Sequence, residues 1–73
     1  MNTYRYNCLV ENENKKYILK AYCVLLQDRY KFVFNISQVD NFYYFDFLIQ
    51  ENEEECNKLV LYLDVYIEYL SKL

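Results

Sequence analysis

Apolar and polar residues alternate along the first two-thirds of the chain, and this period of two is typical of β-strands. The alternation predicts four strands, at residues 3–10, 16–26, 29–36 and 42–49. In the third segment, the apolar side chains of one face are Tyr30, Phe32, Phe34 and Ile36. Because their neighbours are mostly polar, this segment is the clearest strand of the four.

The second and fourth segments indicate how the strands are buried. Residues 16–26 carry apolar side chains on both faces, which is typical of a central strand or of one covered on each side. In the fourth segment we expect Tyr43, Phe45, Phe47 and Ile49 to point inward, and Phe42, Tyr44, Asp46 and Leu48 to point outward. Both faces of the sheet are therefore expected to be partly apolar.

The last third of the chain changes to a helical period. Asn52 can cap the helix, and Glu55 lies three residues later, as in a capping box. The apolar residues that recur at spacings of three and four are Cys56, Leu59, Val60, Leu63, Ile67 and Leu70. This stripe predicts a helix that packs on the sheet.

Together these elements predict one α+β domain over residues 1–73: a four-stranded antiparallel β-meander with one C-terminal α-helix packed on one face, in the order ββββα and in two layers. Such a fold leaves one sheet face uncovered. The residues expected on that face, or their alternates in another register, are Ile18, Tyr22, Val24, Phe42, Tyr44 and Leu48. Because monomers rarely expose a large apolar patch, we expect an interface on this domain.

The composition excludes several classes of chemistry. The chain has no His, the commonest general base, and no Gly, which phosphate loops and serine-nucleophile turns require. We therefore expect no catalytic residues, no cofactor and no enzyme activity. Ten Tyr and five Phe supply a core without a disulfide or a metal. Since Gly and Pro are both absent, Asn and Asp must form the turns.

The three cysteines, Cys8, Cys23 and Cys56, are far apart and follow no metal-ligand spacing. This pattern makes a zinc site improbable and predicts three reduced thiols in a cytoplasmic protein. A Cys8–Cys23 bridge is the alternative, and it requires residues 3–10 and 16–26 to be neighbouring strands in register.

The net charge is −3, with eight Lys and Arg scattered among eleven Asp and Glu. Because a domain that binds nucleic acid needs a basic face, we expect no direct binding of DNA or RNA. The first residues, MNTYRYN, lack the apolar segment of a signal peptide, and no stretch reaches about 18 uncharged apolar residues. We therefore expect no membrane association and a cytoplasmic location.

A second stripe on the predicted helix is the first candidate partner-binding site. Tyr62, Tyr66 and Tyr69 follow one another at intervals of four and three, beside the core stripe. These side chains either wrap the edge of the core, with buried rings and solvated hydroxyls, or form a tyrosine ridge that binds a partner. Tyr is enriched at binding hot spots, which favours the ridge as a hypothesis worth testing.

The second candidate is the acidic end of the helix, formed by Glu53, Glu54 and Glu55. Carboxylates in the first turn interact favourably with the helix dipole, so a solvated helix start explains them. The alternative is that they act with other acidic residues to imitate phosphates and occupy a groove meant for nucleic acid in a partner protein.

In composition the chain resembles the small accessory proteins of phages and mobile elements, which are short, acidic and rich in Asn, Lys and Tyr. Many such proteins, anti-CRISPR proteins among them, inhibit a host enzyme or defence complex. The resemblance, which covers no motif, implies a non-enzymatic inhibitor or adaptor that binds a host protein, one that handles nucleic acid or belongs to a CRISPR complex. The alternative is a structural homodimer or oligomer with no inhibitory role, paired through the sheet face or the ridge.

Overall fold

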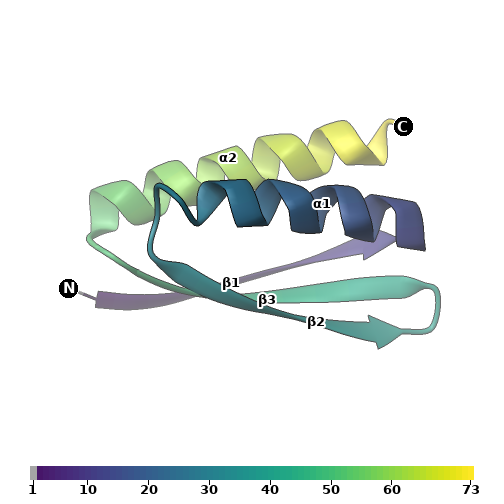
Figure 1. Cartoon of the computed structure of the whole chain (residues 1–73), viewed down its shortest axis with the longest axis horizontal. Coiled ribbons are helices and arrows are strands. Elements are labelled where there is room, and N and C mark those ends of the chain that lie inside the picture. The colour runs from purple at the N-terminus through teal and green to yellow at the C-terminus, as the bar shows by residue number, and fades with distance from the viewer. Residues whose placement is uncertain (1) are drawn as a thin grey trace.

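The computed structural model describes residues 2–73, which form three strands and two helices. Their order along the chain is β1 (Asn2–Glu11), α1 (Glu13–Leu26), β2 (Phe32–Val39), β3 (Phe42–Glu51) and α2 (Glu53–Ser71). The strands form one antiparallel sheet, and both helices lie on the same side of it (Figure 1). The prediction of a four-stranded meander with one C-terminal helix is therefore wrong.

The strand order in the sheet is β1-β3-β2, so β3 occupies the centre and pairs with both neighbours. Since both pairings are antiparallel, β1 and β2 run in the same direction, and α1 connects them across the sheet as a split β-α-β unit. The strands β2 and β3 form a hairpin, which turns at Asp40 with a φ of 56°. The meander prediction failed because a helix, and not a turn, separates the first two strands.

The main correction concerns residues 16–26, which belong to α1 and not to a strand. Lys15, Leu19 and Cys23 are buried at intervals of four, as expected for one face of a helix. In a run that is apolar almost throughout, periods of 2 and 3.6 both fit. Its length of 11 residues, beyond that of most strands, is the signal that favours a helix.

The C-terminal helix α2 confirms the predicted start and stripe. The Asn52 side-chain oxygen accepts a hydrogen bond from the Glu55 backbone N–H at 2.9 Å. The buried residues of the helix are Cys56, Leu59, Leu63 and Leu70, and Val60 and Ile67 pack partly buried beside them. The helix forms where local capping and periodicity both indicate it.

The third predicted strand corresponds to β2, which begins at Phe32, three residues later than predicted. Residues 29 and 30 continue the end of α1, because the backbone N–H groups of Arg29 and Tyr30 both donate to the Leu26 carbonyl, at 3.0 and 2.9 Å. The Tyr30 ring is buried, and Phe32, Phe34 and Ile36 face the core as expected. The alternation therefore identified the inward face of β2 correctly and its first residue wrongly.

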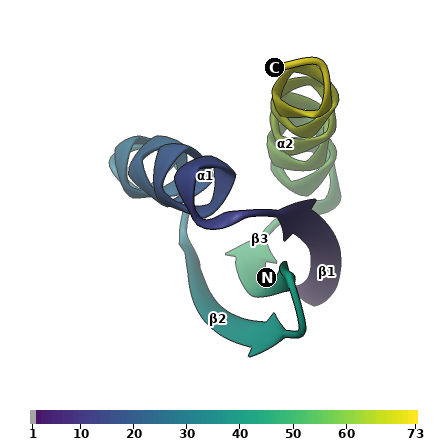
Figure 2. The ribbon, with the colours of Figure 1, turned by 90° about the vertical axis from the view of Figure 1, so that its right-hand side faces the viewer.

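The core lies between the inward face of the sheet and the two helices (Figure 2). The central strand contributes Phe45, Phe47 and Ile49, all fully buried and all predicted to point inward. The helices contribute the buried Leu19, Cys23, Leu59, Leu63 and Leu70. Because each fully buried side chain of this size stabilises the fold by about 1.5–3 kcal/mol, this layer holds both helices against one face of the sheet.

Candidate functional site

The face of the sheet turned away from both helices is the most distinctive surface of the molecule (Figure 2). We call it the open face. It consists of four cross-strand rows in the order β1, β3, β2: Arg5–Leu48–Val33, Asn7–Asp46–Asn35, Leu9–Tyr44–Ser37 and Glu11–Phe42–Val39. Three of these rows contain large apolar side chains, and Leu9, Val33, Val39 and Phe42 are exposed. The predicted outward positions of Phe42, Tyr44 and Leu48 are confirmed.

The expected contribution of the second segment to this face is wrong. Ile18, Tyr22 and Val24 lie on α1, in the helix layer on the other side of the sheet. Their places on the open face are taken by side chains of β1 and β2, chiefly Leu9 and Val33. The open face therefore remains partly apolar, but three strands form it.

Asp46 occupies the middle of the open face, between Asn7 and Asn35 in register. Its side chain is only 31% exposed, and the Arg5 guanidinium Nε lies 3.6 Å from its Oδ1 atom. That distance is too long for a hydrogen bond. The Oδ1 atom is buried and accepts no hydrogen bond from any of residues 2–73. Sequence analysis placed Asp46 on the outward face but gave no signal that one of its carboxylate oxygens would be buried there.

The predicted tyrosine ridge lies along the seam between α1 and α2. The Tyr66 ring stacks on the Tyr22 ring of α1, with the centroids 3.9 Å apart and the planes 10° from parallel. Tyr69 packs beside Tyr66 at 5.8 Å, and Tyr62 contacts the buried Tyr30 ring at 6.3 Å. Tyr62 and Tyr69 remain exposed, whereas Tyr66 is half-buried and already engaged within the molecule.

The predicted acidic end lies in the first turn of α2. The Lys58 ammonium is 3.3 Å from the Glu55 carboxylate and 3.7 Å from that of Glu54, so two of the three carboxylates have a cation beside them. These carboxylates raise the pKa of Lys58, with the hydrogen bond to Glu55 as the largest cause. Both the acidic end and the tyrosine ridge belong to the helix layer, and the structure places neither on the open face.

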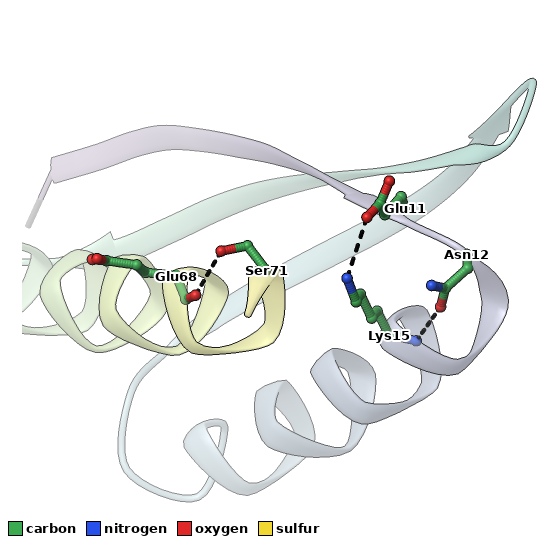
Figure 3. A network of polar contacts seen from close by, with 5 residues as sticks. All are labelled: Glu11, Asn12, Lys15, Glu68 and Ser71. Carbon is green, nitrogen blue, oxygen red and sulfur yellow. Dashed lines mark hydrogen bonds and ion pairs between the residues drawn. The ribbon is translucent and has the colours of Figure 1, made fainter. Parts of the chain in front are cut away.

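A pocket of about 210 Å³ lies where β1 ends, α1 begins and α2 ends. Its lining residues are Leu9, Val10, Glu11, Lys15, Phe42, Ile67, Leu70 and Ser71. The Lys15 side chain is only 10% exposed, and its ammonium lies 3.3 Å from the Glu11 carboxylate (Figure 3). This ion pair holds the first turn of α1 against the end of β1, a contact that sequence analysis missed because Lys15 fell between two predicted strands.

The cysteines are free thiols. Burial raises the pKa of Cys8 to about 12, with a smaller contribution from Asp64, and burial likewise raises the pKa of Cys23 to about 12. The predicted reduced state agrees with the structure. The alternative Cys8–Cys23 bridge required two neighbouring strands, but Cys23 lies on a helix. Within residues 2–73, no three His, Cys, Asp or Glu side chains gather as ligands for one metal ion.

Comparisons with family models, with curated proteins and with solved structures found no match for this chain. Neither helix in the described part of the chain combines the length and the apolar character that crossing a membrane requires.

Proposed function

We propose that this chain is a non-enzymatic inhibitor or adaptor that binds another protein through the open face of its sheet. The observation that carries the proposal is the exposure of Leu9, Val33, Val39 and Phe42 on one side of a sheet whose other side is covered. Exposed apolar side chains on an uncovered sheet face are typical of protein-binding sites.

The state of the thiols supports a role without catalysis. A cysteine nucleophile reacts as the thiolate, but the half-buried Cys8 and the buried Cys23 thiols stay protonated well above neutral pH. With no His in the chain, the most common partner for activating a nucleophile is also absent.

The class of partner follows from the composition and stays a prediction: a host protein, one that handles nucleic acid, in the cytoplasm. The exposed Tyr62 and Tyr69 and the acidic end of α2 stay predicted contributors on the helix layer. Homodimerisation through the open face is the competing use of the same surface.

Site-specific photo-crosslinking tests the proposal. p-Benzoylphenylalanine at Val33, on the open face, should give an adduct with a different protein in cells of the natural source. The matched control places the same probe at Val24, an equally apolar and exposed position on α1. We expect a discrete heterologous adduct from position 33 and none from position 24. An adduct of twice the monomer mass alone would establish the homodimer instead, and equal labelling at both positions would refute the proposal.

A further inference from the structure

The open face has a polar centre inside an apolar surround. Asp46 lies in the middle row with Asn7 and Asn35 beside it, and the rows above and below supply Leu48 and Tyr44. Protein interfaces usually have an apolar centre and a polar rim, so a charged group at the centre must be paired when the partner covers it. The chemistry of that centre therefore indicates what a partner must present.

One cation lies beside this centre: Arg5 forms an ion pair with Asp46 but donates no hydrogen bond to its Oδ1 atom. The buried Oδ1 atom of Asp46 accepts no hydrogen bond from residues 2–73, and Arg5 approaches it only to 3.6 Å from a position that is largely solvated. A buried carboxylate oxygen without a donor is unfavourable, more so than a neutral polar group in the same place. Because the Asp46 side chain is 31% exposed, a cationic side chain arriving from outside the sheet can reach the carboxylate and donate to it.

We infer that the partner inserts an arginine or lysine side chain at Asp46, within an apolar patch that covers the flanking rows. The inference rests on the proposed function, because it assumes that the open face is the binding surface. A guanidinium suits the site particularly well, since its several N–H donors match both a carboxylate and the side-chain oxygens of Asn7 and Asn35.

The negative charge of the protein argues against two other occupants. A second copy stacked on this face would bring a further net charge of −3, and like charges oppose such a pairing. A nucleic acid would place its phosphates against the carboxylate, which repels them. A basic protein segment is attracted to Asp46, whereas a second copy and a nucleic acid are repelled.

Two synthetic amphipathic peptides test the inference by NMR titration of the ¹⁵N-labelled protein. Both carry the same leucine-rich stripe, and they differ only at its centre, where one has arginine and the other its neutral isostere citrulline. We expect both peptides to shift amide signals of the open face and the arginine peptide to bind about tenfold more tightly, because charge-assisted hydrogen bonds are the stronger ones.

The Asp46→Asn variant should bind the two peptides with equal affinity, because it removes the charge and keeps the shape. The control Glu68→Gln removes a charge that is 72% exposed on α2, and should keep the tenfold preference. A urea titration verifies that both variants fold.

The experiment distinguishes failure of the inference about Asp46 from failure of the proposed function. Equal binding of both peptides by the unmodified protein would overturn the inference about Asp46 and leave the proposed function standing. Shifts confined to other surfaces would count against the proposed function itself. If the free protein dimerises and Val33→Lys makes it monomeric, a second copy occupies the face and the inference is overturned.

Discussion

Two asparagines begin the two helices in different backbone conformations. Asn12 accepts a hydrogen bond from the Lys15 backbone N–H at 3.0 Å, and Asn52 accepts the equivalent bond from Glu55. Asn52 has a φ of −71°, whereas Asn12 has a φ of 62°, in the region that favours Gly. In a chain without Gly, Asn12 both makes the sharp turn out of β1 and caps α1.

This difference predicts unequal effects of the same substitution. Asn52→Ala should lower the free energy of unfolding by about 1 kcal/mol, the usual cost of a lost cap. Asn12→Ala should cost about 1 kcal/mol more, since Ala also resists a positive φ. Urea denaturation measures both values. Asn12→Gly should recover most of the loss, and equal stabilities for the Ala and Gly variants would show that the backbone conformation of Asn12 contributes nothing.

At the scale of elements, the seam between α1 and α2 depends on few contacts, and the stacked rings of Tyr22 and Tyr66 are the closest aromatic pair across it. Desolvation raises the pKa of Tyr22, with the neighbouring Tyr66 as the next cause, so this ring pair excludes some water. Part of the predicted ridge therefore stabilises the fold, as the alternative interpretation of these tyrosines held.

Substitution along the ridge should separate stability from binding. Tyr66→Ala should lower the free energy of unfolding by about 1–2 kcal/mol, because it removes the stacked ring and exposes Tyr22. Tyr69→Ala, at a position that is 55% exposed, should change it by less than about 0.5 kcal/mol. Both values come from chemical denaturation, with Tyr66→Phe as the control that keeps the stack. Equal destabilisation by Tyr66→Ala and Tyr69→Ala would contradict a special role for the seam.

At the scale of the whole molecule, the core keeps titratable groups in their neutral form. Tyr6 on β1 donates a hydrogen bond to Asp64 on α2, and burial together with this bond raises the pKa of Tyr6. The Cys8 thiol lies on the same inward face of β1 as Tyr6. Sheet and helices thus enclose groups that ionise only at high pH.

The raised thiol pKa values predict a loss of stability at alkaline pH. In the unfolded chain, Cys8 and Cys23 ionise near their ordinary pKa of 9.0, but in the folded protein they stay protonated up to about 12. Since the unfolded state then binds fewer protons, the free energy of unfolding should fall as pH rises from about 9 towards about 12. Urea titrations across this range measure the slope. Cys8→Ala should make the slope shallower, whatever its effect at neutral pH, and an unchanged slope would contradict the assignment.

The sequence alone predicted the elements whose signals are local and unambiguous. Strict alternation identified β1, β3 and the inward side chains of β2, and the cap at Asn52 located the start of α2. These predictions hold because a strand or a capped helix with one apolar face is specified by neighbours a few residues apart.

Tertiary structure decided the rest. Residues 16–26 fit a strand or a helix until packing of Leu19 and Cys23 against the sheet selected the helix, and this choice removed one strand and set the order β1-β3-β2. The burial of the Asp46 Oδ1 atom likewise depends on which strands lie beside β3. The sequence predicted an uncovered face with Phe42, Tyr44 and Leu48 on it, but local periodicity carries no information about which strands lie beside β3, so the tertiary structure decided the rest of that face.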